Sequence, residues 1–277
     1  MNTMTISDIG ELKRAKMILE NPGFAMKAIN YLGMPIEKGL EALPKKVMDT
    51  VQVGLEKAAD AALFSMKDLQ GESKSNYVHK AAVATTGAVG GFLGIEALVV
   101  ELPISTTIML RSIADIARSH GESLADIEVK FECLKVFALG GRSASDDAAE
   151  SSYWTIRNAL GKVVSEATAE VASRVAAADA ASAAASKAVN EAAEQVASKN
   201  SSSVLVKLIE SITERYGISV SEKVLAQAVP VVGALGGAAI NTMFIDHFQD
   251  MAEGHFIVRK LERTYGSEIV RETYRAL

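Results

Sequence analysis

Hydrophobic residues recur at intervals of three and four along most of the chain, which is the spacing of one buried face of an α-helix. Alternating β-branched residues are rare, and only five prolines interrupt the pattern. The pattern therefore predicts an all-α fold, a multi-helix bundle, for the 277 residues.

Breaks in the pattern place the ends of the helices. Gly121, Gly217 and Gly266 end three similar runs (RSHG, RYG and RTYG), and a glycine in this position commonly stops a helix. Pro103 should kink or restart its helix, and Ser219 should open a new one through a capping box with Glu222. The predicted helices cover residues 44–69, 79–120, 123–139, 153 onward, 201–215, 219–262 and 267–276.

Two apolar, glycine-rich stretches stand out, residues 81–103 and 224–245. The second contains no charged residue and is long enough to cross a bilayer, since a span needs roughly 20 apolar residues. Glycines recur four residues apart in both, as in Gly233 and Gly237, which leaves bare backbone on one helix face. We expect the two stretches to pack together as two central helices.

Such a pair suits either the buried centre of a helical protein or a membrane-inserting element. Glu96 and Glu101 lie in the first stretch and Pro230 in the second. A carboxylate at mid-bilayer costs about 2.5–3.5 kcal/mol on insertion scales. We therefore favour the buried pair and keep insertion as the alternative.

Residues 166–199 differ in kind from the rest, because they hold fifteen alanines in 34 residues. Alanine is the best helix former, but the apolar stripe of this segment is thin. The segment is predicted to be an exposed helical arm or hairpin inserted in the domain. A disordered low-complexity insert is the competing interpretation.

Composition narrows the classes of function. The net charge is −5 and no block of Lys and Arg stands out, which argues against nucleic-acid binding. The single cysteine, Cys133, excludes an intramolecular disulfide and a Cys-based zinc site. A charged N-terminus without the apolar core of a signal peptide predicts a cytoplasmic location. No catalytic or cofactor motif is present, so we expect no cofactor.

Several polar residues lie beside apolar surroundings and are the candidates for a ligand-binding site. They are Glu96, Glu101, Arg111, Asn241, His255 and Arg259. If buried, they must pair with one another, because an unpaired buried charge is costly. They would then form either an ion-pair network that fixes helix register or a pocket for a lipid head group or small ligand.

The helix through residues 241–262 carries both acidic residues and histidines, the side chains of a possible metal site. Asp246, Asp250 and Glu253 share one face at about 100° per residue, and we expect that face to be solvated. His255 lies on the opposite, apolar side, so no metal site is expected on this helix. Arg259 and Glu262 are three apart and are expected to pair locally.

Several segments carry motifs of a known family. They are Leu32–Glu37, Gly87–Gly94, Glu101–Pro103, Arg111, Gly121, Arg215–Lys223, Ala228–Asn241, Phe244, His247, His255, Arg259, Glu262 and Gly266. On these residues the chain resembles the EcsC protein family over most of its length. Residues 166–199 match no pattern of that family.

The resemblance implies a single all-helical bacterial domain over residues 1–277, with 166–199 as an insertion, and no assigned enzymatic activity. The namesake is encoded beside an ABC transporter, which implies membrane-linked accessory work. We therefore expect a non-enzymatic protein at the inner face of the cell membrane, peripheral or inserted. It would bind lipid or a membrane protein such as an ABC transporter, in support of transport or secretion. The alternatives are a hydrolase with a His/Glu pocket at the helix crossing and a soluble homo-oligomeric scaffold.

Overall fold

The computed structural model describes residues 4–20, 45–65, 95–139, 152–182, 203–227 and 233–277. Side chains are described for residues 4–20, 49–59, 101–139, 153–177, 204–224 and 239–277. The helices are α1 (Ile6–Leu19), α4 (Lys45–Ser65), α6 (Ile95–Ser119), α7 (Ile127–Leu139), α8 (Ser152–Ser182), α10 (Ser203–Gln227), α11 (Gly233–Tyr265) and α12 (Ser267–Ala276). The described residues contain no strand, and the all-α prediction is confirmed.

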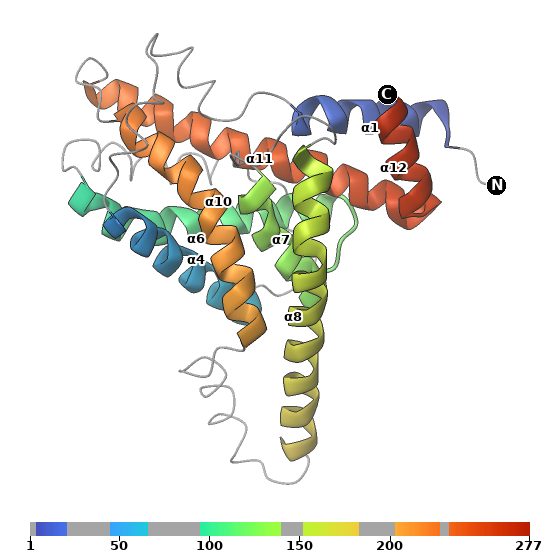
Figure 1. The fold of residues 1–277 in the computed structure, drawn as a ribbon, viewed down its shortest axis with the longest axis horizontal. Coiled ribbons are helices and arrows are strands. Elements are labelled where there is room, and N and C mark those ends of the chain that lie inside the picture. The colour runs from blue at the N-terminus through green and yellow to red at the C-terminus, as the bar shows by residue number, and fades with distance from the viewer. Residues whose placement is uncertain (1–3, 21–44, 66–94, 140–151, 183–202, 228–232) are drawn as a thin grey trace.

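Helix α7 lies at the centre of the bundle and contacts α6, α8, α10 and α11 (Figure 1). Its side chains from Val129 to Leu139 are all buried. Three of them, Lys130, Glu132 and Lys135, are charged. Since residues 129–139 of α7 have no face left in water, these charges must be balanced by partners inside the protein.

Helix α11 is the longest helix described, with 33 residues, and spans about 50 Å at ~1.5 Å per residue. It joins the apolar, glycine-rich segment to the charged amphipathic one without a break, as the periodicity predicts. Figure 1 shows α1 lying along the C-terminal half of α11 and α12 turning back toward α1. The N- and C-terminal helices therefore sit together at one end of the molecule.

Two of the three predicted glycine stops are confirmed. Gly121 and Gly266 have φ angles of 81° and 87°, the left-handed conformation that glycine adopts without strain. The stop at Gly217 is wrong, because α10 continues from Ser203 to Gln227. The predicted capping box is also wrong, since Ser219 and Glu222 are buried inside that helix.

The packing of Tyr216 explains why α10 passes through Gly217. The Tyr216 ring is fully buried, 4.8 Å from the ring centroid of Phe137 and 5.4 Å from that of Phe248. Its hydroxyl shares a 3.0 Å hydrogen bond with Thr106 of α6. Burying a large side chain is worth about 1.5–3 kcal/mol, which exceeds the cost of about 1 kcal/mol for glycine inside a helix.

Helix α6 also continues through Pro103, where a kink or a restart was predicted, so the restart is wrong. It runs through Pro103, whose carbonyl accepts a 2.8 Å hydrogen bond from the Thr107 hydroxyl. The Ser105 hydroxyl donates to the carbonyl of Leu102 at 3.1 Å. Proline has no backbone N–H to donate to the helix, and these two hydroxyl groups add hydrogen bonds beside that gap. Packing of α4 and α11 along α6 also stabilises the helix here.

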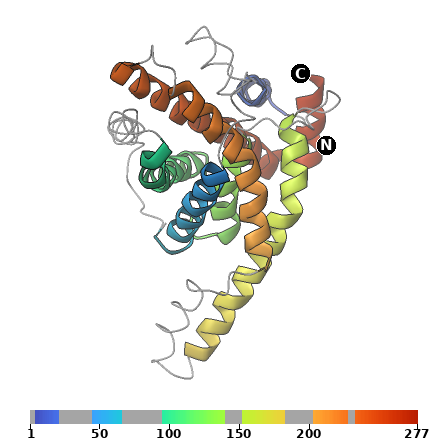
Figure 2. The ribbon, with the colours of Figure 1, turned by 60° about the vertical axis from the view of Figure 1, so that its left-hand side comes forward.

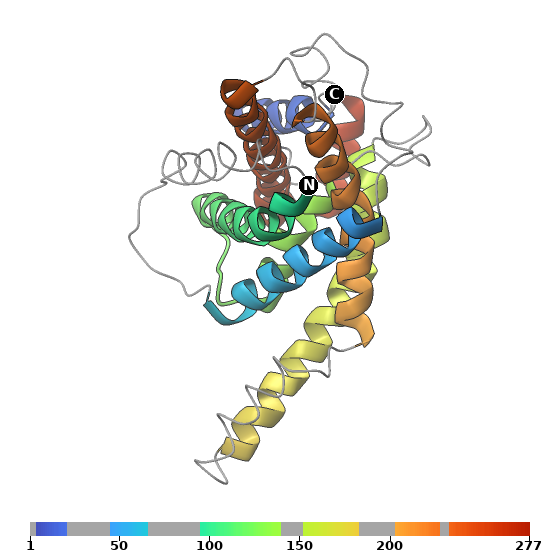
Figure 3. The same cartoon turned by 90° about the vertical axis from the view of Figure 1, so that its left-hand side faces the viewer.

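Helix α8 begins in the core and then leaves it. Tyr153, Ile156 and Leu160 are buried, whereas Val175 is 49% exposed. Figures 2 and 3 show the later turns of α8 projecting away from the body of the molecule. The predicted alanine-rich arm is thus helical as far as Ser182, and its remainder lies outside the described residues.

The predicted pairing of the two glycine-rich stretches falls largely on residues 66–94 and 228–232, outside the described residues. The second stretch is divided, because α10 ends at Gln227 and α11 begins at Gly233. Among the helices described, none combines the length and the apolar character needed to cross a membrane.

Candidate functional site

The structure divides the six candidate residues between several places. Asn241 and His255 both lie on α11 but are about four turns apart, or about 21 Å along the helix axis. Arg111 is exposed on α6, and the side chain of Glu96 lies outside the described side chains. The candidates therefore do not form a single pocket: Glu101 and Asn241 belong to one buried cluster, and His255 belongs to another that Arg259 extends.

The first group is the Glu101 cluster, formed by Glu101 of α6, Lys223 of α10 and Asn241 of α11. Lys223 Nζ donates to Glu101 Oε1 at 2.9 Å, and Asn241 Nδ2 donates to the same oxygen at 3.4 Å. All three residues are less than 9% exposed. Lys223 Nζ also lies 5.1 Å from the ring centroid of Phe244. The cluster ties three helices together with compensated charge.

The second group is the Glu132 cluster, formed by Glu132 and Lys135 of α7, Tyr153 of α8 and His255 of α11. Glu132 Oε2 lies 2.8 Å from His255 Nε2, and His255 Nδ1 lies 3.1 Å from the Tyr153 hydroxyl. Lys135 Nζ donates to Glu132 Oε1 at 2.7 Å. The His255 side chain is 0% exposed.

Charge states within the cluster follow from burial and neighbours. Burial alone would raise the pKa of Glu132, but the Lys135 ammonium and the hydrogen bond from His255 hold that pKa well below its usual range. Burial lowers the pKa of His255 to about 3, so the imidazole is neutral at physiological pH. An ionised Glu132 only accepts hydrogen bonds, and we therefore assign the imidazole hydrogen to Nε2.

This tautomer orders the remaining hydrogen bonds in one direction. With Nδ1 of His255 as an acceptor, the Tyr153 hydroxyl donates to it. The Tyr153 oxygen in turn accepts from Arg157 Nη1 at 3.2 Å. Arg157 also forms an ion pair with Glu262 and lies 5.1 Å from the ring centroid of Trp154. Each ring nitrogen of His255 is thus occupied by a protein partner.

Arg259 extends the cluster toward the surface. Its Nε donates to Glu122 Oε1 at 2.9 Å, and both Nη atoms lie 3.3 Å from Glu128 Oε1. The sequence predicted a local pair between Arg259 and Glu262. That prediction is wrong, because Glu262 pairs with Arg157 instead. Glu122 also pairs with Arg263. Arg259 therefore fixes α11 to α7 and to the turn before it.

The acidic face of α11 is not a solvated face, contrary to the prediction. Gln249 is buried and donates to the Ser112 hydroxyl at 2.7 Å. Glu253 lies 3.0 Å from His120 Nε2 and 3.4 Å from Arg14 Nη2. The reason is tertiary: α6 and α1 both pack along α11 and cover this side of the helix.

The buried arrangement contains acid–base groups but offers them little freedom. A general acid or base must come within hydrogen-bond reach of its substrate, and His255 is fully buried with both nitrogens occupied. Burial raises the pKa of the Cys133 thiol, which keeps it neutral. Within the described residues, no three His, Cys, Asp or Glu side chains gather in a way that could hold a metal ion.

The sequence did not identify Glu132, Lys135, Tyr153 or Lys223 as members of buried clusters. A signal existed for the first two, since they lie three residues apart inside an otherwise apolar run. Lys223 gave no comparable signal, because its partner Glu101 is 122 residues away.

Comparisons with known proteins agree with the resemblance noted in the sequence. The sequence model of the EcsC protein family matches residues 26–261. No curated protein and no solved structure matches the chain.

Proposed function

Since the chain belongs to the EcsC protein family, we propose that it is a non-enzymatic helical accessory protein of a bacterial membrane. It attaches to the inner face of the membrane and binds lipid or a membrane protein there, such as a transporter. It acts by binding through its surface, and its buried polar groups stabilise the fold.

The observation that supports this proposal most is the internal pairing of the buried polar side chains. Glu132, His255 and Tyr153 bond to one another, and Glu101 bonds to Lys223. Each cluster joins three helices. A ligand that entered either cluster would have to break buried hydrogen bonds, which cost about 1–3 kcal/mol each when left unmade. Surface binding needs no such rearrangement.

One observation favours a hydrolase as a second candidate. Glu132, His255 and Tyr153 form a carboxylate–imidazole–hydroxyl line, an arrangement in which a base can activate a hydroxyl group. This function requires an opening motion that brings substrate to Tyr153, which is 2% exposed. Hydrolysis of p-nitrophenyl esters by the wild-type chain, lost in a folded Tyr153→Phe variant, would support it.

Fractionation of the expressed full-length chain tests the proposed function. Membranes are pelleted and washed separately with high salt, with carbonate and with detergent. Release by salt or carbonate indicates attachment at the membrane surface, and release by detergent alone indicates insertion. A chain found wholly in the soluble fraction would contradict the proposal and favour the soluble scaffold or the hydrolase.

A further inference from the structure

Helix α1 has two faces of different kinds. The inner face packs on α11 through Leu12, Ala15 and Leu19, which are at most 6% exposed. The acidic residues of the helix are also turned toward the body. Asp8 accepts a hydrogen bond from the Tyr265 hydroxyl, and Glu11 pairs with Lys260 at 3.0 Å. Its carboxylates are thus engaged by α11.

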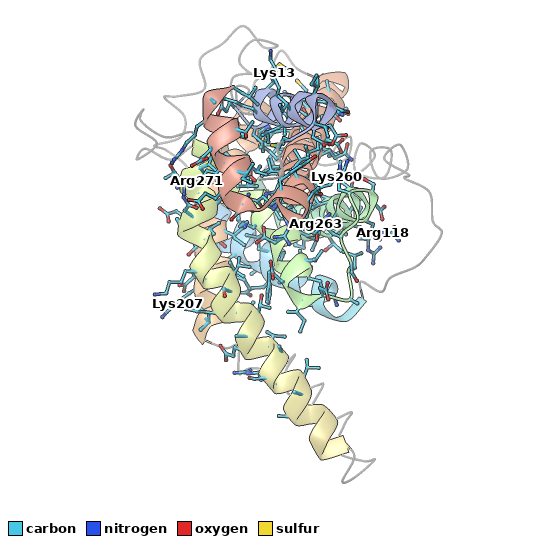
Figure 4. All side chains as sticks on the ribbon, turned by 90° about the vertical axis from the view of Figure 1, so that its right-hand side faces the viewer. Lys13, Arg118, Lys207, Lys260, Arg263 and Arg271 are labelled. Carbon is cyan, nitrogen blue, oxygen red and sulfur yellow. The ribbon has the colours of Figure 1, made fainter. Side chains whose placement is uncertain are left out.

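The outer face of α1 consists of Ile6, Gly10, Lys13 and Met17, which lie within about 60° of one another at ~100° per residue. Ile6 is 92% exposed and Met17 is 61% exposed. They are the two most exposed large hydrophobic residues among the described side chains. Figure 4 shows Lys13 pointing away from the body of the molecule.

The charge of this face is basic along the helix and acidic only at its end. Lys13 lies between Ile6 and Met17, and Arg14 lies beside it with 61% of its side chain exposed, despite a 3.4 Å contact with Glu253. Glu20, the exposed residue that caps the C-terminus of α1, is the acidic residue at the edge of the face. Exposed apolar side chains interleaved with cationic ones suit binding to an anionic lipid surface. The apolar side chains can insert between the lipids, and the cations neutralise the lipid phosphates.

We infer that the outer face of α1 is the surface through which this protein docks on an anionic lipid bilayer. The inference rests on the proposed function, which it makes specific. Ile6 and Met17 enter the boundary between head groups and acyl chains, and Lys13 and Arg14 face the lipid phosphates. The inner face of α1 stays on α11, so the rest of the chain is carried to the membrane as one body.

A lipid surface fits this face better than a protein partner does. The stripe from Ile6 to Met17 is about 16 Å long at ~1.5 Å per residue, and it holds two apolar side chains. A stable protein interface buries about 1,200–2,000 Å² with an apolar centre. A short apolar and basic stripe is instead suited to weak, reversible attachment to a surface that presents many identical anionic groups.

Vesicle flotation with the full-length chain tests the inference. One set of vesicles contains equal parts of phosphatidylglycerol and phosphatidylcholine, and the other contains phosphatidylcholine alone. The wild-type chain should bind the anionic vesicles and be released by high salt. An Ile6→Ser/Met17→Ser variant should bind them about tenfold more weakly, because two inserted apolar side chains are lost.

Two further variants sharpen the test. Ile104→Ser removes a hydrophobic residue that is 47% exposed on α6, away from α1, and should leave vesicle binding unchanged. Glu20→Gln removes the acidic edge and should strengthen binding to anionic vesicles. All the substituted side chains are exposed, so circular dichroism and thermal unfolding should match the wild type.

The outcomes separate the inference from the proposed function. Unchanged vesicle binding by folded Ile6→Ser/Met17→Ser would overturn the inference and leave membrane attachment in place through another surface. Failure of the wild-type chain to bind either vesicle would also overturn it. Cell fractionation would then decide whether attachment depends on a membrane protein or does not occur.

Discussion

His255 on α11 donates its Nε2 hydrogen to Glu132 on α7 across 2.8 Å, with both side chains buried. The contact joins the longest helix described to the helix at the centre of the bundle. It also fixes the imidazole as neutral, with Nδ1 left to accept from Tyr153. A single hydrogen bond thus sets the direction of the line that begins at Arg157 and ends at Glu132.

The neutral, buried His255 should make the fold sensitive to acid. The unfolded chain binds a proton at a histidine below about pH 6.5, whereas the folded chain does so only near pH 3. The unfolded state therefore holds more protons in this window, and the free energy of unfolding falls as the pH falls. We expect a loss on the order of 3 kcal/mol between pH 6.5 and pH 4, measured by urea unfolding at each pH.

His255→Gln provides the control for that measurement, because glutamine keeps a donor and an acceptor but does not titrate. The variant should be less stable at pH 7 and should show a flatter dependence between pH 6.5 and pH 4. Equal slopes for the variant and the wild type would show that His255 is not the group responsible.

The Glu132–Lys135 pair should be strongly coupled. Glu132→Gln leaves the buried Lys135 ammonium with a neutral partner, and breaking a buried ion pair from one side typically costs about 3–5 kcal/mol. Glu132→Gln/Lys135→Met removes both charges and keeps an acceptor for His255. The double variant should therefore lose less than the sum of the single variants in a double-mutant cycle of unfolding free energies. Additive losses would contradict a direct interaction.

Gly254 should be required for the close contact between α1 and α11. A Cβ at this position would lie 2.7 Å from Leu19 Cγ and 3.3 Å from the Ala15 carbonyl oxygen. Gly254→Ala should destabilise the chain by about 1–3 kcal/mol, since α1 must shift. Gly161→Ala on α8 is the matched control, because a Cβ there meets nothing within 4 Å, and it should stabilise by about 1 kcal/mol. If thermal unfolding ranks the two variants in the opposite order, Gly254 is not required for the close contact between α1 and α11.

Lys223→Met should destabilise the chain because it leaves the Glu101 carboxylate buried with Asn241 as its remaining partner. The expected loss is about 3–5 kcal/mol, measured by denaturant unfolding. Glu101→Gln/Lys223→Met should recover part of that loss. No recovery in the double variant would mean that the charge of Glu101 is balanced in another way.

Local patterns were sufficient to predict much of the fold. The all-α class, the continuous α11, the start of α8 near Tyr153 and the bounds of α12 all follow from helical periodicity and glycine stops. The stop at Gly217 failed because a local signal cannot register the aromatic side chains that surround Tyr216. Tertiary packing there outweighs the helix propensity of one glycine.

The candidate site was harder to predict, for a related reason. Asn241, His255 and Arg259 are correctly placed on one helix, but periodicity carries no information about which distant helix faces each of them. Their partners come from α6, α7 and the turn between those helices. The partial burial of the acidic side of α11 was missed because the covering helices α1 and α6 are remote in sequence.

The most direct test of the central claim, that the buried clusters serve the fold and the surface serves function, is the membrane-bound fraction of the Glu132→Gln/Lys135→Met variant. The fraction is measured beside the wild type after cell fractionation, with circular dichroism and cooperative unfolding as the check on folding. We expect a folded variant that remains on the membrane to the same extent as the wild type. A folded variant that no longer reaches the membrane would contradict the claim and assign the Glu132 cluster a direct part in function.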